Sequence, residues 1–436
     1  MGSMSTTQNL VIITLLEKSN KDIRFVENWR PISLINVDVK VCSKALSNRI
    51  IDLLPKLIHP NQAAFVKGRN IDDPLRFLAD LFDYVENNED KSYILFAADF
   101  QKAFDSIEHN FMFAVLRHFG FGENFIQWIK IMLKNSKSCV LNNGNVSDFF
   151  ELKRGTKQGD PISPSLFILT IEIMAELIRS NKEIRGLQVD KEMDTNKLVL
   201  FADDATFCVK DVESLEKILE SLELFKTYSS LQLNFEKSEV GWIGDAKDEK
   251  LLGTIIKKKI NFQISGVKIL GIYFSHNQEY TRINNLERIF ENFKSILSMW
   301  KMRNLTLYGK SQVVRSLAIS QLLFVCSKIS VPHSFIKKVE KEITKFLWNE
   351  KKPKVKYKTL IADYNEGGIR LPDFESIIQA NRAGWALKLT MDSKERSYWK
   401  YFAQILFKSF GGLDILGENF DPSYILKSNK FPVFYK

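Results

Sequence analysis

Two kinds of apolar pattern alternate along this chain. Short continuous runs, such as residues 10–16 and 93–98, are too brief for helices and predict buried strands. Longer stretches repeat apolar residues every three or four positions, as at Phe77, Leu81 and Val85, and these predict amphipathic helices. Both strands and helices are therefore expected along the chain.

The same spacing rules locate the other elements. The apolar helix faces expected from them are Val41, Ala45, Leu46 and Ile50; residues 111–119, ended by Gly120; Phe125, Ile129, Met132 and Leu133; Phe167, Ile171, Met174 and Ile178, after a cap at Ser163-Pro164; Leu215, Ile218, Leu219, Leu222 and Phe225; and Leu286, Ile289, Phe290, Phe293, Leu297 and Trp300. A further helix is expected to begin at Arg315. Asn143-Gly144 is a strong turn signal that predicts a hairpin between residues 138–141 and 149–152.

The stretch KLVLFADDATFCV, residues 197–209, carries a chemical signal. Its β-rich runs, 198–201 and 206–209, flank a short turn, so it predicts a tight hairpin with Asp203 and Asp204 at the tip. Adjacent carboxylates repel each other and lose hydration if the flanking strands are buried, so folding alone does not reward the pair. A hard divalent cation bound between the two carboxylates would compensate for this cost. The alternative is an Asp-Asp turn that faces water.

A third acid, Asp99, ends the apolar strand predicted at residues 93–98. A carboxylate at the end of one buried strand, with two more on a later hairpin, is a way to gather oxygen ligands around two Mg²⁺ ions. We therefore expect Asp99, Asp203 and Asp204 to meet in space.

Three segments in this order, ADFQKAFDSI, RGTKQGDPISPSLF and FADD, resemble successive motifs of the reverse transcriptase palm. NWRPISLINVDVKVCSKALSNRI upstream, and FLWNEKKPK and GGIRLPDF downstream, are similar to segments of the polymerases of LINE-type non-LTR retrotransposons. This resemblance runs nearly end to end and implies an α+β right-hand polymerase fold. It implies fingers at residues 1–92, a palm of antiparallel sheet backed by helices, with interleaved finger elements, at 93–265, a helical thumb at 266–340, and a post-thumb segment at 341–436 that we expect to be truncated.

The resemblance also implies roles for single residues. Asp99, Asp203 and Asp204, with the carbonyl of Phe100, would hold two Mg²⁺ ions, for which Mn²⁺ can substitute. Lys237 would be a general acid beside the leaving pyrophosphate, although a surface lysine fits the sequence equally well. The residues implied to contact the incoming nucleotide are Arg30, Lys18, Phe100, Gln101, Phe104 and Gln158. Those implied to contact nucleic acid are Arg69, Gly159, Leu270, Gly271, Lys351, Lys352 and Lys354.

Several of these residues have structural alternatives. Arg30 lies among apolar residues in the sequence, which is costly for a guanidinium unless it meets an anion, either a triphosphate or a structural carboxylate. Phe104 resembles an aromatic gate that excludes the 2′-hydroxyl of a ribonucleotide, and its alternative is a core phenylalanine. The loop around Gln158 is either a nucleotide contact or a plain glycine-rich turn. Residues 346–349 and the lysines that follow suit base stacking and phosphate contact, or form a helix end with solvated lysines.

The chain has 436 residues and a formal net charge of +10, which favours an anionic partner but does not choose among nucleic acid, a membrane surface and an acidic protein. The charge is uneven. Residues 261–360 contain 18 Lys or Arg against 6 Asp or Glu, so the remaining residues carry a small negative balance. A polymerase would place such a basic surface along the nucleic-acid duplex and keep acids at its metal site.

The four cysteines, Cys42, Cys139, Cys208 and Cys326, lack the spacing of a zinc site or a disulfide framework. Reduced thiols suit an intracellular protein, either nuclear or cytoplasmic. The longest apolar run is too short to span a bilayer and no signal-peptide pattern precedes it, so no membrane partner is expected.

The function implied by the resemblance is an RNA-directed DNA polymerase that extends a primer 3′-hydroxyl with dNTPs by two-metal phosphoryl transfer. Its partners would be an RNA template, a DNA primer, the RNA–DNA hybrid and dNTPs. The alternatives are a catalytically inactive retroelement relic that only binds nucleic acid, and a DNA-templated polymerase. LINE-type polymerases usually also carry a nuclease and a Cys/His-rich segment. Neither pattern occurs in this sequence, so target nicking is not assigned to it.

Overall fold

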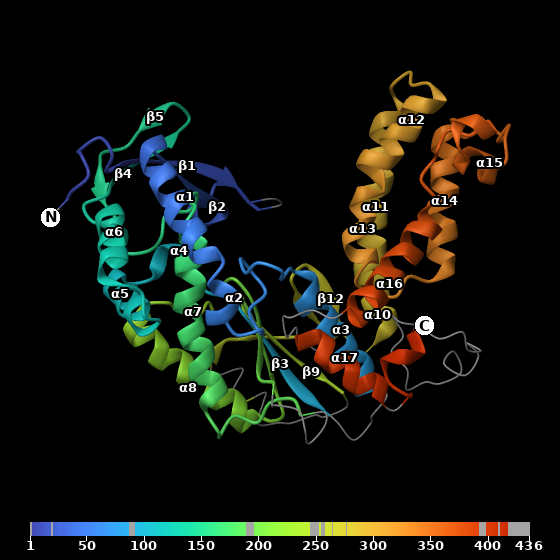
Figure 1. The fold of residues 1–436 in the computed structure, drawn as a ribbon. Helices are drawn as coiled ribbons and strands as arrows, with labels where there is room; N and C mark the ends of the chain where they lie inside the picture. Colours follow the sequence, from blue (N-terminus) through green and yellow to red (C-terminus); the bar gives the residue numbers. More distant parts are fainter. Residues whose placement is uncertain are drawn as a thin grey trace. The chain divides into compact units, whose positions relative to one another are not determined.

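Figure 1 shows the computed structural model of the chain, which describes residues 2–18, 21–86, 92–188, 196–244, 253, 258–263, 265–275, 277–391, 398–408 and 410–416. The chain forms two compact units. The first comprises residues 1–74, 93–240 and 247–262, and the second comprises residues 75–92, 241–246 and 263–436. The chain contains both helices and β-sheets, so the predicted α+β class is confirmed.

The first unit contains a five-stranded sheet in the order β10-β9-β3-β8-β7. β3 pairs antiparallel with β8, and β8 pairs antiparallel with β7, whereas β10 pairs parallel with β9. The predicted antiparallel sheet is therefore present around β8, and the parallel pair at one edge makes the whole sheet mixed. Its strands are β3 (Tyr93–Ala98), β7 (Leu198–Phe201), β8 (Asp204–Val209), β9 (Glu239–Ile243) and β10 (Asn261–Phe262).

Helices back this sheet. α8 contacts β3 and β8, and α7 packs against α8 and α5. In α7, apolar side chains are buried almost all round the helix and not only along the predicted stripe. The described helices of the first unit are α1 (Val37–Ile51), α2 (Leu54–Leu57), α4 (Ala103–Ser106), α5 (His109–His118), α6 (Glu123–Leu133), α7 (Ser163–Ser180) and α8 (Val212–Ser229), with a 3₁₀ turn at Val26–Asn28. α3 (Asp72–Glu86) starts in the first unit and continues into the second.

A second sheet of the first unit has the order β2-β1-β4-β5, and β6 also pairs with β4. β1 runs antiparallel to β2 and parallel to β4. Asn143 and Gly144 form the turn between β4 and β5, both with positive φ, so the predicted hairpin is confirmed. The strands are β1 (Leu10–Glu17), β2 (Trp29–Ile35), β4 (Lys137–Asn142), β5 (Asn145–Val146) and β6 (Phe150–Glu151).

The predicted N-terminal helix is present as α1, but of the predicted apolar face only Ile50 is buried. Val41 is 64% exposed. The hydroxyl of Ser43 bonds the buried carboxylate of Asp160, and the hydroxyl of Ser47 donates to the carbonyl oxygen of Pro161 at 3.0 Å. Small hydroxyl side chains let α1 approach the loop before α7 closely and satisfy its polar groups, so packing overrides periodicity here. The side chains that α1 buries are Val39, Ser43, Ser47 and Ile50.

One predicted helix cap and one predicted helix start are wrong. The N-cap of α7 is Ile162, without a side-chain hydrogen bond, and Pro164 lies in the first helical turn instead of capping it. Proline is tolerated there because an N–H at that position has no partner within the helix. The helix expected to begin at Arg315 begins earlier, after Thr306, whose Oγ1 accepts a hydrogen bond from the Gly309 N–H at 3.2 Å.

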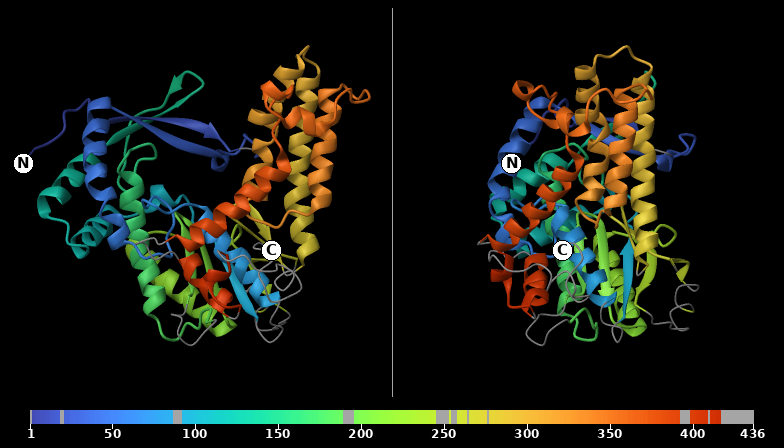
Figure 2. Two further views of the ribbon diagram at one scale, coloured as in Figure 1. Left: turned by 45° about the vertical axis from the view of Figure 1, so that its right-hand side comes forward. Right: turned by 90° about the vertical axis from the view of Figure 1, so that its right-hand side faces the viewer.

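The second unit consists mainly of helices. Figures 1 and 2 show its long helices side by side, and α11 packs against α13 and α14. The ring of Phe290 lies at this contact, 5.8 Å from the ring of Phe335 between centroids. The helices predicted from the apolar stripes are therefore present. Their assignment to a thumb, and the division of the chain into fingers, palm and thumb, remain predictions. Among the residues that the structure describes, no helix is both long enough and apolar enough to cross a bilayer.

The elements of the second unit begin with a small hairpin. They are β11 (Val267–Ile269), β12 (Ile272–Phe274), α10 (Gln278–Arg282), a π-helical turn (Ile283–Glu287), α11 (Arg288–Lys301), α12 (Leu307–Val313), a second π-helical turn (Val314–Ala318), α13 (Ser320–Cys326), α14 (His333–Leu347), α15 (Tyr357–Ile361), α16 (Phe374–Thr390) and α17 (Tyr398–Lys408), with 3₁₀ turns at Tyr364–Glu366 and Leu413–Leu416.

Candidate active site

The main sheet of the first unit brings the three predicted acids to one place. β3 and β8 are paired as far as Ala98 and Ala205. Asp99 follows β3 directly, so it lies at the end of the sheet where β8 begins with Asp204. The turn between β7 and β8 consists of residues 202–203, two fewer than predicted, and it contains Asp203, the first acid of the pair. The register in which β8 pairs with β7 and β3 therefore forms the acidic hairpin and places it beside Asp99.

Each of the three carboxyl groups has a raised pKa, and burial is the main cause. The pKa of Asp204 rises to about 6, because desolvation is reinforced by the negative charges of Asp203 and Asp99. Burial also raises the pKa of Asp203, with a smaller contribution from Asp99. For Asp99 itself, burial raises the pKa while the positive charges of Lys237 and Lys18 partly offset this rise. The site concentrates negative charge that a bound cation would relieve.

Carboxylate oxygens are the ligands that Mg²⁺ and Mn²⁺ prefer, so the chemistry of this donor set fits a hard divalent ion. Within the described ranges, no group of three or more His, Cys, Asp or Glu side chains is already arranged to hold a metal. Phe100, the predicted main-chain ligand, forms an isolated bridge with Leu233, and its side chain is buried. The binding of ions by these residues remains a prediction.

Lys18 and Lys237 lie near Asp99, and Arg30 and Lys102 lie near Lys18. We call these four side chains the cation cluster: Lys18, Arg30, Lys102 and Lys237. Burial lowers the pKa of Lys18, and the positive charges of Lys237, Arg30 and Lys102 lower it further. Its Nζ donates to the carbonyl oxygen of Glu27 at 2.8 Å. Because like charges repel, this gathering favours the binding of an anion. Lys102 was not predicted, although its place within the ADFQKAFDSI motif is a usable signal.

Arg30 is placed differently from expectation. The sequence puts it among apolar residues, but on β2 its side chain is exposed, because successive residues of a strand point to opposite faces of a sheet. Because the guanidinium of Arg30 is in contact with water, no anion is needed to offset a cost of burial at this position. A contact with a triphosphate rests instead on the proximity of Arg30 to Lys18.

The predicted nucleotide contact Gln158 lies on a loop that is fastened to β2. Its main-chain oxygen accepts a hydrogen bond from the Ser33 N–H at 2.7 Å, and its Nε2 donates to the Asp105 carboxylate at 3.2 Å. Gly159 has a φ of 107°, and a Cβ there would lie 2.9 Å from the carbonyl oxygen of Ser33. Glycine is thus required by the close approach of two main chains. Its role behind a template base remains a prediction.

Phe104 shows features of both alternatives. Its ring stacks on Phe167 with centroids 4.2 Å apart and lies edge-on to Phe65 at 6.5 Å, as a core residue would. It is nevertheless only half-buried, so one side can meet a ligand. Gln101 is exposed, and its N–H donates to the carbonyl oxygen of Gln232 at 2.9 Å.

The role predicted for Arg69 is corrected by its contacts. Its Nη1 donates to the carbonyl oxygens of His59 and Gln62, both at 2.8 Å. Its Nη2 donates to the carbonyl oxygens of Ile58 at 3.0 Å and Pro55 at 3.4 Å. A guanidinium that is committed to four main-chain oxygens holds the preceding loop in place and does not serve as a phosphate contact.

Gln62 was missed by sequence analysis, although it touches the acidic hairpin directly. The side chain is only 1% exposed. Its Oε1 accepts from the N–H groups of Ala202 at 3.0 Å and Ala64 at 2.9 Å, and its Nε2 donates to the carbonyl oxygen of Ala202 at 3.4 Å. Ala202 has a φ of 55°, a left-handed conformation that costs a residue with a Cβ about 1–2 kcal/mol. A single glutamine in a loop gives no sequence signal of such a contact.

The remaining predicted nucleic-acid contacts lie in the second unit. Leu270 and Gly271 form the turn between β11 and β12, both with positive φ, and Arg288 donates to the carbonyl oxygen of Gly271 at 3.1 Å. Phe346 is 4% exposed and belongs to the core, so the predicted base stacking is excluded for this side chain. The lysines that follow α14 are exposed and accessible to phosphate: Lys351, Lys352 and Lys354.

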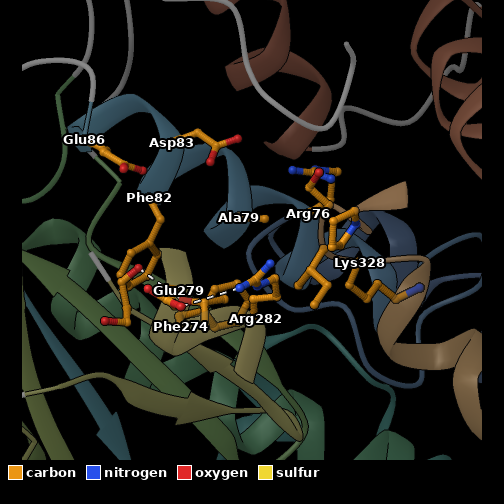
Figure 3. Close-up of a pocket in the computed structure, with 14 residues that line it drawn as sticks. Arg76, Ala79, Phe82, Asp83, Glu86, Phe274, Glu279, Arg282 and Lys328 are labelled. Carbon is orange, nitrogen blue, oxygen red and sulfur yellow. Dashed lines mark hydrogen bonds and ion pairs between the residues drawn. The ribbon is translucent and has the colours of Figure 1, made fainter. Parts of the chain in front are cut away.

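A cavity of about 470 Å³ also lies in the second unit, and none of the predicted site residues lines it (Figure 3). The rings of Phe82 and Phe274 stack in it with their centroids 5.5 Å apart. The Nη2 of Arg282 lies 3.6 Å from the Oε1 of Glu279. Basic and acidic side chains are mixed along its wall, so its charge does not select one kind of ligand. The other charged lining residues are Arg76, Lys328, Asp83 and Glu86.

A helix-backed sheet with paired acids on a tight hairpin, beside a cation cluster, is the arrangement of a right-hand polymerase palm. The chain belongs to the reverse transcriptase (RNA-dependent DNA polymerase) family, whose model matches residues 16–274. It is 30% identical over 350 residues to the "Transposon TX1 uncharacterized 149 kDa protein" of Xenopus laevis, an alignment that covers 80% of this chain and 26% of the relative. The resemblance stated from the motifs is confirmed.

The chain is also similar to other relatives and to solved structures. The Pol polyprotein from the type-2 retrotransposable element R2DM of Drosophila melanogaster is 27% identical over 259 residues, which cover 59% of this chain and 23% of the relative. The human picobirnavirus RNA-dependent RNA polymerase, as an insertion-loop deletion mutant, has a TM-score of 0.48 at 12% identity over 86% of this chain and 64% of that one. Candida tropicalis telomerase in complex with a fragment of telomeric RNA has a TM-score of 0.46 at 12% identity, and the match covers 92% of this chain and 65% of that one. The chain spans between a quarter and a third of the length of the curated relatives TX1 and R2 of Popillia japonica.

Proposed function

We propose that this chain is an RNA-directed DNA polymerase that extends the 3′-hydroxyl of a DNA primer on an RNA template. The proposal is carried by the strand register that brings Asp99 to the acidic hairpin, beside the cation cluster, in a member of the reverse transcriptase family. Acids provide ligands for divalent ions, and cations attract a polyphosphate. These are the two requirements of a site that transfers a nucleotidyl group.

Asp99, Asp203 and Asp204 would hold the divalent ions, Mg²⁺ or Mn²⁺, which when bound neutralise phosphate charge and lower the pKa of a nearby hydroxyl. The chain's own residues orient the substrates. The cation cluster draws the triphosphate toward the acids. Lys237 is exposed and its charge acts on Asp99, so its ammonium group is a candidate proton donor to the leaving pyrophosphate.

The sugar and base of the incoming nucleotide would be contacted by Phe104 on α4 and by Gln158 on the loop before α7. Phe104 presents the exposed part of its ring as a gate against a 2′-hydroxyl, which predicts a preference for dNTPs over rNTPs. Gln158 is held from two sides, through its main chain by Ser33 and through its side chain by Asp105. A contact residue whose position is fixed in this way loses little conformational entropy when substrate binds.

The RNA–DNA hybrid would be held through phosphate contacts by the basic excess of residues 261–360. Such binding does not depend on sequence and weakens steeply with salt, because it releases counterions from the nucleic acid. The exposed lysines after α14 are candidates for part of it: Lys351, Lys352 and Lys354.

The proposal is tested by Mg²⁺-dependent incorporation of dTTP on an oligo(dT)-primed poly(rA) template. The wild-type chain should extend the primer, and Asp203→Asn should not, while its binding of primer–template persists. Asp148→Asn, which changes an exposed acid between β5 and β6, is the matched control and should retain activity.

Three outcomes separate the alternatives. Extension on poly(rA) but not on poly(dA) supports the proposal. Equal extension on both templates would make the chain a polymerase that also copies DNA. No extension with either Mg²⁺ or Mn²⁺, together with salt-dependent binding of primer–template, would overturn the proposal in favour of a relic that only binds nucleic acid.

A further inference from the structure

One carboxamide contacts the acidic hairpin on both sides of a single residue. The Oε1 of Gln62 accepts from the Ala202 N–H at 3.0 Å, and its Nε2 donates to the Ala202 carbonyl oxygen at 3.4 Å. The Ala202 N–H belongs to the peptide unit that joins Phe201 to Ala202, and the Ala202 carbonyl belongs to the peptide unit that joins Ala202 to Asp203. An amide side chain suits this task because it carries an acceptor and a donor a fixed distance apart.

Gln62 is itself firmly held. Its neighbours pair with β7, since the Leu200 N–H donates to the Asn61 carbonyl oxygen at 2.9 Å and the Ala63 N–H donates to the Leu200 carbonyl oxygen at 3.0 Å. The main-chain oxygen of Gln62 accepts from the guanidinium of Arg69 at 2.8 Å. With the side chain fully buried, the carboxamide has little freedom to turn or retreat.

The hairpin depends on this contact because its turn is strained. Ala202 is buried and has a φ of 55°, a conformation that residues with a Cβ rarely adopt. Without Gln62, the N–H and carbonyl oxygen of Ala202 would lose these partners in a place that water reaches poorly, and the turn would relax toward another conformation. Asp203 is the next residue, so any relaxation changes the direction of its side chain and of Asp204.

We propose that Gln62 is a positioning residue that sets the direction of Asp203 and Asp204 by bonding the peptide groups on both sides of Ala202. This inference deepens the proposed function and rests on it. Gln62 does not touch substrate, and it acts on the reaction only through the hairpin. Its loss should therefore lower the turnover rate and leave the apparent affinity for dTTP nearly unchanged.

The test uses Gln62→Met, which has a similar shape but neither hydrogen bond, and Gln62→Glu, which keeps the acceptor but, when ionised, has no donor for the Ala202 carbonyl. Gln127→Met, at an exposed glutamine of α6, is the matched control. Three quantities are measured for each: kcat and KM for dTTP on oligo(dT)/poly(rA), the hydrogen exchange of residues 198–209, and far-UV circular dichroism.

In both Gln62 variants, we expect exchange within residues 198–209 to be about tenfold or more faster, the factor that corresponds to one net hydrogen bond. We expect kcat to fall about tenfold or more, because misplaced reacting groups lose that much rate, with KM changed less than about twofold. Gln127→Met should match the wild type in every measurement.

The proposal is overturned if either Gln62 variant keeps wild-type exchange in the hairpin, or if kcat is unchanged while exchange is faster. It is also overturned if both variants lose the native circular dichroism, since Gln62 would then be needed for folding and not for positioning. Failure of the wild type to incorporate dTTP would instead refute the proposed function. In that case the exchange measurement still decides whether Gln62 holds the hairpin.

Discussion

Replacing Asp204 with asparagine should stabilise the metal-free protein while it abolishes nucleotide addition. The folded chain holds Asp204 near Asp203 and Asp99, and burial together with their charges raises the pKa of Asp204 from 3.8 to about 6. Above that pH the ionised carboxylate destabilises the folded state, because an unfolded chain would keep the same charge fully hydrated. Asparagine keeps the shape of the side chain and removes its charge.

The size of the effect follows from the pKa shift and from exposure. A shift of about two pKa units corresponds to about 3 kcal/mol of differential free energy. By surface area Asp204 as a whole is exposed, although surrounding atoms desolvate its carboxyl group. Solvent screening therefore reduces the free energy of destabilisation to about 1 kcal/mol. For a unit of ordinary domain size, a gain of about 1 kcal/mol raises the melting temperature by about 2–4 °C.

Thermal unfolding of the wild type and Asp204→Asn without divalent ions, above pH 7 and near pH 4, measures this difference. Above pH 7 the variant should melt at the higher temperature. As the pH falls through 6 toward 3.8, the folded wild type takes up a proton before the unfolded chain does. The destabilisation is thereby lost, and the advantage of the variant should nearly vanish near pH 4. Saturating Mg²⁺ at neutral pH should reverse the order, because a bound cation stabilises only the chain that keeps all three acids.

The matched control is Asp211→Ala, which removes a carboxylate with a favourable partner. The Asp211 carboxylate caps α8 by accepting from the Ser214 N–H at 2.9 Å, so its loss should lower the melting temperature. If Asp204→Asn melted below the wild type above pH 7 without divalent ions, the three carboxylates would not be a source of repulsion. The description of the site would then be incorrect.

Three further changes test other parts of the chain. Lys197→Met should lower the unfolding free energy by about 2–3 kcal/mol, measured by thermal melting, because Lys197 Nζ donates to three carbonyl oxygens at the end of α7. Phe104→Ala should raise the ratio of rNTP to dNTP incorporation, and should also cost about 3 kcal/mol of stability because the ring is stacked on Phe167. Joint replacement of three exposed lysines by alanine should lower the slope of log affinity for primer–template against log salt concentration by up to about 3. These lysines are Lys351, Lys352 and Lys354.

Each of these predictions has a result that contradicts it. Lys210→Met changes an exposed lysine at the end of β8 and should leave the melting temperature unchanged, so equal effects of both lysine variants would remove the special role of Lys197. An unchanged nucleotide ratio in Phe104→Ala would leave Phe104 as a core residue. An unaltered salt slope in the triple variant would exclude those lysines from phosphate contact.

The sequence by itself determined the local elements and the family. The apolar runs at residues 93–98 and 198–201 are short and continuous, so they read as strands without any knowledge of their partners. The acidic pair Asp203-Asp204 between two β-rich runs predicted the hairpin, and the order of the motifs identified the reverse transcriptase family. These signals succeed because they depend on residues close together in the chain.

Only the tertiary structure decided which polar side chains are structural. Ser43 on α1 faces inward because it bonds Asp160, and Arg69 is directed at the main chain of its own loop. Two buried lysines bond the carbonyl ends of helices, Lys157 at α6 and Lys310 at α14. Hydrophobic periodicity predicts which side chains are buried. It does not predict which distant peptide group will form a hydrogen bond with a polar side chain.

Gln62 shows this limit most clearly. It lies 140 residues before Ala202, and no local pattern links the two positions. Their contact exists because the loop of residues 61–63 pairs with β7, which places the carboxamide against the turn that carries the acids. The residue types needed for the chemistry can thus be read from the chain, whereas their directions depend on hydrogen bonds that form only once the sheet has assembled.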